Sequence, residues 1–197
     1  MNASKLNSML VNWTMNNSGI EYRDYLGMSA IGDCRLKLYT RMIQGQRFNL
    51  QDHLFCYEGY LAERDIIERL RSLDTSALGP SQEFSDFGGR FQGHTDGSWD
   101  GDLLEVKSVA KTEWLPTTDR IAAKHYWQVQ IYMMYGRYEE TKMIYKARDT
   151  GQMRVVHIKR NHRVGEMARI KAQEILEAVD HRRPPECDCG RCINSNQ

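Results

Sequence analysis

Residues 93–108 read GHTDGSWDGDLLEVKS, and their pattern predicts a β-hairpin. Asp100-Gly101 is a strong two-residue turn signal, because a type I′ turn needs a positive φ at both central positions and this pair tolerates it. Trp99 and Asp102 should therefore flank the turn. Side chains alternate between the two faces of a strand, so this turn also fixes which side chains of the hairpin lie together.

The predicted register brings four polar side chains to one face. Asp96 is expected opposite Glu105, and His94 opposite Lys107. Two carboxylates in directly opposed positions repel each other unless something compensates. A hard divalent cation such as Mg²⁺ would compensate, since it binds carboxylate oxygens and retains several waters. From these residues alone, the alternative is a solvent-exposed hairpin whose charges only confer solubility.

Length and composition are those of a globular protein. The 197 residues are enough for one domain with a buried core, and 41% hydrophobic and 27% charged residues is an ordinary composition. The formal net charge of +1 gives no overall attraction to nucleic acid, so a nucleic-acid surface would need local clusters of Lys and Arg. Residues 1–11 lack the pattern of a secretory signal and no segment has membrane-spanning length, so a cytoplasmic location without a membrane partner is expected.

The hydrophobic spacing predicts a chain that contains both helices and strands. Helices are expected at about 5–16, 29–42, 53–73, 120–135 and 164–179. Strands are expected at 90–95, 141–147 and 153–159. We expect a single domain over residues 1–197, with residues 1–28 as an N-terminal extension and residues 180–197 as a tail.

Details of the helices add further expectations. Ser29 is a predicted N-cap for the second helix, and residues 117–119 offer N-caps for the fourth. Gly59 lies inside the third helix, where glycine is unfavourable and can mark the close approach of another backbone. On the fourth helix, His125, Gln128 and Tyr132 form a polar stripe beside an apolar one, as expected of a helix that lines a cleft.

The tail is the second informative stretch. Residues 180–197 have almost no apolar side chains, which predicts disorder unless something else holds the chain. Cys187, Cys189 and Cys192 fall within six residues, a spacing that favours thiolate ligation of zinc or of an iron–sulfur cluster over disulfides in a reducing compartment. A site with four ligands needs one more sulfur, which Cys34 or Cys56 would supply.

Taken together, these motifs resemble those of the RecB-like PD-(D/E)XK nucleases. The resemblance spans about Ser29 to Cys192 and rests on motifs in the expected order: Gly59-x₃-Glu63, Gly93-His94-Thr95-Asp96-Gly97, Glu105-Val106-Lys107 and Gln128-x₃-Tyr132. Cys34 and the three cysteines of the tail are similar to those of the iron–sulfur subgroup, which includes the CRISPR-associated RecB-like exonucleases and the nuclease domain of AddB. The resemblance implies an α/β fold with a mixed sheet, namely a restriction-endonuclease-like core with flanking helices and a C-terminal cysteine cluster.

The resemblance also implies roles for individual residues. Asp96 and Glu105 would bind Mg²⁺ or Mn²⁺ directly, with the Val106 carbonyl as a third ligand and Glu63 completing the shell. Lys107 would orient or activate the attacking water. The implied residues of the active-site helix are Gln128 and Tyr132. The implied ligands of a 4Fe-4S cluster are Cys34, Cys187, Cys189 and Cys192.

Two departures from the family pattern stand out. Thr95 occupies the position before Asp96 where the family name places proline. The terminal Cys-x-Cys-x₂-Cys spacing is tighter than usual, which keeps structural Zn²⁺ open as the alternative to the cluster.

The family function is metal-dependent hydrolysis of DNA. We expect an exonuclease that acts on single-stranded DNA ends in recombination, repair, replication or CRISPR adaptation, of prokaryotic or viral origin. Expected partners are DNA, a helicase, recombinase or CRISPR-adaptation protein, and further copies of the chain. The alternatives are a non-catalytic nucleic-acid-binding or adaptor module, and a structure-specific or restriction-type endonuclease. The chain has no Gly-x₄-Gly-Lys-Ser/Thr loop, so it carries no helicase motor of its own.

Overall fold

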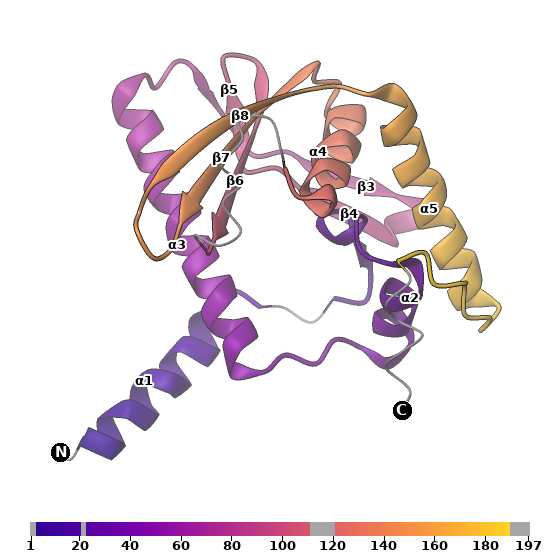
Figure 1. Cartoon of the computed structure of the whole chain (residues 1–197), viewed down its shortest axis with the longest axis horizontal. Helices are drawn as coiled ribbons and strands as arrows, with labels where there is room; N and C mark the ends of the chain where they lie inside the picture. The colour runs from indigo at the N-terminus through magenta and orange to yellow at the C-terminus, as the bar shows by residue number, and fades with distance from the viewer. Residues whose placement is uncertain (1–2, 21–22, 111–120, 190–197) are drawn as a thin grey trace.

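The computed structural model describes residues 3–20, 23–110 and 121–189, which form a mixed α/β fold (Figure 1). The helices are α1 (Ala3–Asn17), α2 (Arg35–Gln44), α3 (Leu50–Leu73), α4 (Ala123–Gly136) and α5 (His162–Asp180). The strands are β1 (Leu26–Gly27), β2 (Leu78–Gly79), β3 (Glu83–Asp86), β4 (Phe91–His94), β5 (Gly97–Trp99), β6 (Asp102–Val109), β7 (Glu140–Ala147) and β8 (Met153–Lys159). Two short 3₁₀ helices are η1 (Met28–Ala30) and η2 (Phe87–Gly89).

The larger sheet has five strands in the order β2-β5-β6-β7-β8. Strand β6 lies at its centre, antiparallel to β5 and parallel to β7. Parallel neighbours need a crossover connection, and α4 lies in the connection between β6 and β7. The sheet therefore contains both kinds of pairing, and the predicted mixed α/β class is confirmed.

The strand that precedes the hairpin belongs to a second sheet. Strand β4 lies between β1 and β3 in a three-stranded sheet, and His94 pairs with Glu83. The prediction that His94 lies opposite Lys107 is therefore wrong. The ladder between β5 and β6 ends at the pair Gly97 and Leu104, where Gly97 adopts a φ of 146° that takes the chain out of the ladder.

Helices cover both faces of the five-stranded sheet (Figure 1). Helix α3 covers one face, where Ile66 packs in a cluster with Leu104, Val106 and Ile144. Helix α4 covers the other face, and α5 packs on α4. Because side chains alternate along a strand, Leu103 enters the core on the α4 side while its neighbour Leu104 enters the core on the α3 side.

The predicted helices are all present, but the N-cap residues of α2 and α4 differ from those predicted. Helix α2 begins at Arg35, so Ser29 is not its N-cap. The residues around Ser29 form η1 instead, and Met28 is fully buried in the main core, which keeps this segment out of the helix. Ala122 occupies the N-cap of α4 and makes no side-chain cap bond. The predicted caps at 117–119 lie outside the described residues.

Helix α3 is the longest helix of the described chain. It begins with a reciprocal capping box, in which the Asn49 side chain accepts from the Asp52 N–H and the Asp52 side chain accepts from the Asn49 N–H. In its interior, a Cβ atom placed on Gly59 would meet no atom of the described residues within 4 Å. The prediction that Gly59 permits close approach of another backbone of this chain is therefore wrong.

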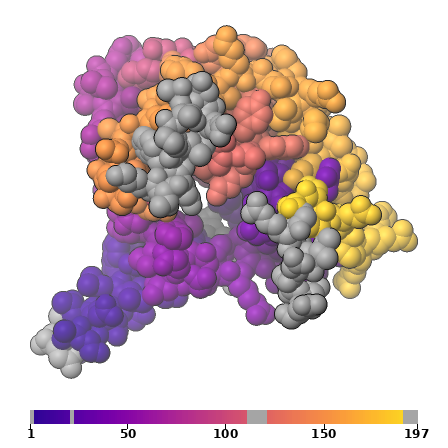
Figure 2. Space-filling model, in the orientation of Figure 1, coloured from indigo at the N-terminus to yellow at the C-terminus, as the bar shows by residue number. Residues whose placement is uncertain are grey.

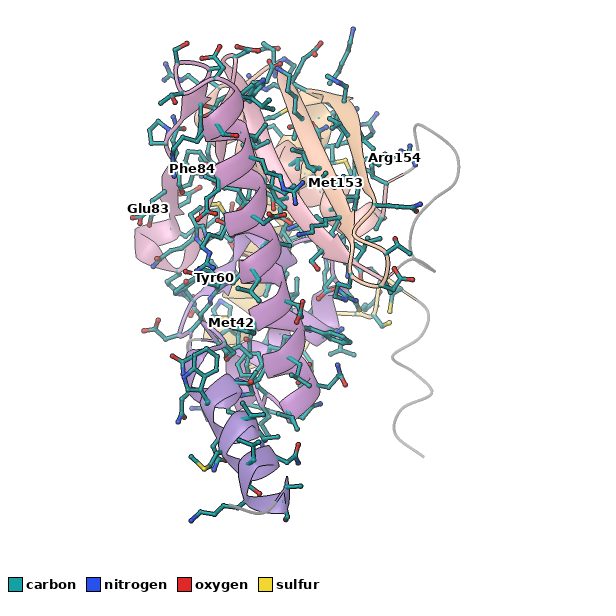
Figure 3. All side chains as sticks on the ribbon, turned by 90° about the vertical axis from the view of Figure 1, so that its left-hand side faces the viewer. Met42, Tyr60, Glu83, Phe84, Met153 and Arg154 are labelled. Atoms are coloured by element: carbon teal, nitrogen blue, oxygen red, sulfur yellow. The ribbon has the colours of Figure 1, made fainter. Side chains whose placement is uncertain are left out.

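Helix α1 extends away from the rest of the molecule (Figure 2). None of its residues is buried, and it contacts α3, where the rings of Trp13 and Tyr57 meet edge-on with centroids 5.5 Å apart. Figure 3 views the molecule from the α3 side, with Phe84 of β3 and Met153 of β8 on opposite sides of α3. Within the described residues, none of the helices has both the length and the apolar character needed to span a membrane.

Candidate active site and cysteine cluster

The hairpin has the predicted turn. Asp100 and Gly101 have φ values of 51° and 80°, and Trp99 pairs with Asp102 directly before and after them. Asp96 follows two residues after β4, and its Oδ2 accepts a hydrogen bond of 2.6 Å from the Val106 N–H. This bond holds the Asp96 carboxylate against the backbone of β6, beside Glu105.

Glu105 is the buried acid of the site. Its side chain lies near the middle of β6, and the residue is only 2% exposed. Its Oε1 accepts hydrogen bonds from Lys107 Nζ at 2.6 Å and from Gln128 Nε2 at 2.7 Å. Its Oε2 is buried and has no hydrogen-bond partner among the described residues. An unpartnered buried carboxylate oxygen is costly, so this atom is the natural place for a cation.

Three carboxylates from three elements interact electrostatically at this place. Burial and then the Asp96 carboxylate raise the pKa of Glu105 to about 8, although Lys107 opposes the shift. Burial and then Asp96 raise the pKa of Glu63, on α3, to about 7. Burial also raises the pKa of Asp96, against the lowering effects of Lys107 and His94. Carboxylates that are this hard to ionise together suit a site that binds a divalent cation.

Helix α4 supports the site from the other side. Gln128, 3% exposed, holds Glu105, and Tyr132, 2% exposed, lies one turn further along the helix. A Cβ atom on Gly93 would come within 2.9 Å of the Tyr132 ring and 2.7 Å of the Met28 side chain, so only glycine fits there. Burial and the Glu105 carboxylate raise the pKa of Tyr132, which therefore stays protonated.

His125 and Tyr145 extend the polar wall of the site. The Nδ1 atom of His125 lies 3.0 Å from the Tyr145 hydroxyl oxygen. Burial and the nearby Lys107 ammonium lower the pKa of His125 to about 3, so the imidazole is neutral. The polar stripe on α4 predicted the place of His125. Tyr145 was missed, because its position depends on the parallel register that sets it beside Lys107.

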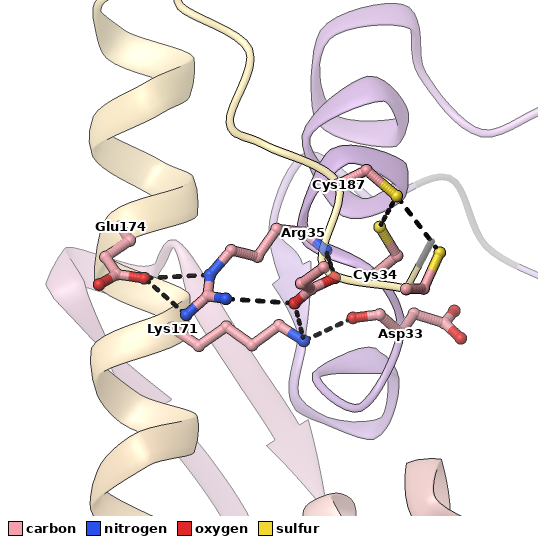
Figure 4. Close-up of polar contacts among 8 residues, drawn as sticks. Asp33, Cys34, Arg35, Lys171, Glu174 and Cys187 are labelled. Atoms are coloured by element: carbon pink, nitrogen blue, oxygen red, sulfur yellow. Dashed lines mark hydrogen bonds and ion pairs between the residues drawn. The ribbon is translucent and has the colours of Figure 1, made fainter. Parts of the chain in front are cut away.

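A second candidate site is formed by Cys34 and two cysteines of the tail, Cys187 and Cys189 (Figure 4). Cys34 is 8% exposed and occupies the N-cap position of α2. Its Sγ lies 3.7 Å from the Sγ of Cys187, which lies 3.5 Å from the Sγ of Cys189. In the part of the chain that the structure describes, these three form the one set of His, Cys, Asp or Glu side chains whose ligand atoms all lie within 4.8 Å of one another.

The remaining cysteines of the sequence are Cys56 and Cys192. Cys192 lies outside the described residues. Cys56 is exposed on α3 and is not part of the cluster. Of the two cysteines that could complement the tail, the structure brings Cys34 to it.

Sequence comparisons and structural comparisons give different results. No model of a protein family matches the chain, and no curated protein does. Solved structures match it over most of its length. The protein SSO0001 has a TM-score of 0.61 at 14% identity, covering 95% of this chain and 93% of that one.

Two of the similar structures are exonucleases. The alkaline exonuclease LHK-Exo of Laribacter hongkongensis, in complex with dAMP, has a TM-score of 0.58 at 13% identity and covers 81% of this chain and 90% of its own. A phage-related exonuclease of Haemophilus somnus 129PT has a TM-score of 0.60 at 10% identity and covers 84% of this chain and 97% of its own. At these identities the likeness is one of fold, and the chain therefore has an exonuclease-type fold.

Proposed function

We propose that the protein is a divalent-metal-dependent deoxyribonuclease that removes nucleotides from the ends of single-stranded DNA. The observation that carries this proposal is the Oε2 atom of Glu105, buried beside Asp96 and Lys107 without a hydrogen-bond partner among the described residues. A solvent-exposed charged hairpin would leave these groups in water. Here Glu105 is buried and accepts a hydrogen bond from Gln128 of α4.

The residues fit Mg²⁺ or Mn²⁺. Asp96, Glu105 and the Val106 carbonyl would hold the ion, and Glu63 would reach it from α3. A bound ion of this kind lowers the pKa of its water and neutralises the charge that develops on the phosphate. Lys107, whose Nζ lies 2.6 Å from Glu105 Oε1, would orient the attacking water.

Two further residues assist by position. Gln128 fixes the rotamer of Glu105 through its 2.7 Å hydrogen bond, so that one carboxylate oxygen is occupied and the other is left for the ion. Tyr132 packs against Gly93 and shapes the wall of the site next to the segment that carries Asp96. The exonuclease folds of the similar structures, one of them with bound dAMP, support a DNA end as the substrate.

The test is an assay on single strands labelled at the 5′ or the 3′ end, with Mg²⁺, Mn²⁺ or EDTA. Wild type should shorten the strands in either metal and not in EDTA. Asp96→Ala and Lys107→Ala should each abolish cleavage while the protein stays folded. Asp102→Ala and Lys142→Ala are matched controls, because these residues form a 2.8 Å ion pair at the hairpin turn outside the acidic site.

Other outcomes would favour other functions. Cleavage by Asp96→Ala at the wild-type rate would exclude the proposed catalytic site. Binding of single strands without cleavage in either metal would favour the non-catalytic nucleic-acid-binding module. Cutting of closed circular DNA would favour an endonuclease. The absence of a motor motif is consistent with a partner helicase or recombinase that supplies DNA ends.

The cysteine cluster is proposed as a structural metal site with Cys34, Cys187, Cys189 and Cys192 as ligands. Zn–S bonds of about 2.3 Å in a tetrahedron place the sulfurs about 3.8 Å apart. The observed separations of 3.5 and 3.7 Å are close to that spacing. Ligands of a 4Fe-4S cluster bind different irons and stand farther apart. The sulfur spacing therefore favours Zn²⁺, with the iron–sulfur cluster of the RecB-like subgroup as the alternative.

Metal analysis after anaerobic purification separates the two. Zinc near one equivalent without iron supports a zinc site, whereas brown protein with iron and acid-labile sulfide supports the cluster. Cys34→Ser should lose the metal in either case. Unchanged metal content in Cys34→Ser would exclude Cys34 as a ligand.

A further inference from the structure

Asp188 lies between Cys187 and Cys189 in the sequence, and its carboxylate contacts residues of α2 and α5. Its Oδ1 accepts a hydrogen bond of 3.0 Å from the backbone N–H of Arg35. Its Oδ2 lies 3.2 Å from Arg35 Nη1 and 3.3 Å from Lys171 Nζ. The carboxylate therefore joins the tail to both α2 and α5 through nitrogen donors.

The first of these bonds completes a helix. The first N–H groups of an α-helix have no partner within the helix, and a side chain before the helix normally accepts from one of them. Cys34 occupies the N-cap position of α2 but makes no side-chain cap bond. Asp188 supplies the missing acceptor to Arg35 from 153 positions further along the chain. Its negative charge at a helix N-terminus is also favourable.

The two cations that hold Asp188 are themselves fixed. Arg35 also contacts Glu174 of α5, with Nη2 3.0 Å from the carboxylate (Figure 4). Lys171 is 5% exposed and donates a 2.6 Å hydrogen bond to the Asp33 carbonyl, directly before Cys34 (Figure 4).

All of these contacts hold the Asp188 carboxylate through nitrogen donors, and none of them depends on a bound metal. We propose that Asp188 is a positioning residue that docks the tail onto α2 and holds Cys187 and Cys189 against Cys34 before metal binds. This inference rests on the proposed cysteine metal site. Binding to a preformed set of ligands avoids the entropy of ordering the tail, so removal of Asp188 should weaken metal binding although Asp188 is not a ligand.

The test uses Co²⁺ as the probe, since thiolate-bound Co²⁺ absorbs visible light. The full chain is stripped of metal under reducing, anaerobic conditions and titrated with Co²⁺. We expect Asp188→Ala to bind Co²⁺ about 10- to 100-fold more weakly than wild type, as is usual when a partner that orients metal ligands is lost. Asp188→Asn should lose less, because its amide oxygen can still accept from Arg35. Asp102→Asn is the matched control, because Asp102 pairs with Lys142 at the hairpin turn, and its Co²⁺ affinity should equal that of wild type.

Melting temperatures in chelator give a second readout that needs no metal. Asp188→Ala should melt about 2–4 °C below wild type, because α2 loses its cap. Equal Co²⁺ affinities, or equal melting temperatures in chelator, for wild type and Asp188→Ala would overturn the inference. If wild type shows no thiolate-to-cobalt absorption, the cysteine metal site itself is excluded, and the role of Asp188 in that site with it.

Discussion

The ammonium group of Lys171 lies 5.2 Å from the centre of the Trp127 ring, and this contact connects the cysteine cluster to the helix of the acidic site. Lys171 bonds to the tail at Asp188, and Trp127 directly precedes Gln128 on α4. A second connection runs through Gly32, where the segment before Cys34 lies against the first turn of α4. Helix α4 therefore contacts both the acidic site and the residues that hold the cysteine cluster.

A substitution at Gly32 tests how closely this segment packs against α4. A Cβ atom at Gly32 would lie 2.4 Å from the Cα of Lys124, and backbone atoms cannot move aside cheaply. We expect Gly32→Ala to lower the free energy of unfolding by about 1–3 kcal/mol, as overpacking does. Gly59→Ala is the control, because a Cβ atom there meets no atom of the described residues within 4 Å and alanine favours a helix interior by about 1 kcal/mol. Urea denaturation measures both, and a Gly32→Ala variant as stable as wild type would contradict the close contact.

Repulsion between carboxylates predicts the behaviour of Asp96→Asn. In this variant the side-chain amide oxygen can still accept from the Val106 N–H, while the charge that raises the pKa of Glu105 and Glu63 is gone. The metal-free variant should therefore melt above metal-free wild type, and Mg²⁺ should no longer raise its melting temperature. Asp102→Asn should keep the response to Mg²⁺. A wild-type Mg²⁺ response in Asp96→Asn would show that the ion binds elsewhere.

The same carboxylates predict a pH dependence of stability. In the unfolded chain Glu63 and Glu105 release their protons near pH 4.5, whereas in the folded protein they hold them up to about pH 7 and about pH 8. Between these limits the folded state binds more protons than the unfolded state, so its stability falls as pH rises. In chelator, the melting temperature should decrease from pH 5 to pH 8.5. Mg²⁺ should oppose the decrease, because it binds the ionised carboxylates.

A matched variant isolates this contribution. Glu63→Gln removes one of the two titrating groups and should flatten the slope between pH 5 and pH 7 in chelator. A melting temperature of wild type that rises steadily to pH 8.5 without metal would contradict the raised pKa values.

Local signals in the sequence located much of the fold and of the candidate site. The Asp100-Gly101 turn fixes its own register, and helical spacing placed α3, α4 and α5 near their observed bounds. The errors concern choices that distant residues decide. His94 lies in the three-stranded sheet and not in the hairpin, because its strand β4 pairs with β1 and β3. The predicted helix start at Ser29 was wrong, because Met28 packs in a core formed by other elements and α2 begins only at Arg35. The cap from Asp188 has no signal in a local pattern, since its two ends are 153 positions apart.

Two glutamines on α4 allow the positioning of Glu105 to be distinguished from the stabilisation of the fold. Gln128 Nε2 donates to Glu105 Oε1 at 2.7 Å. Gln130 is fully buried and joins α4 to the end of β8, donating to the Lys159 carbonyl at 2.9 Å and accepting from the Asn161 N–H at 2.6 Å. Both side chains satisfy buried polar groups, so truncation of either should cost about 1–3 kcal/mol of stability.

Their effects on catalysis should differ. Gln128→Ala frees the carboxylate of Glu105 to rotate toward Lys107, and we expect kcat on labelled single strands to fall at least 10-fold, since a misplaced catalytic group loses rate steeply. Gln130→Ala should match the loss of stability but keep kcat per folded molecule, measured well below the melting temperature of each variant. Equal kcat values for the two variants would show that Gln128 serves the packing of α4 and does not position the acid.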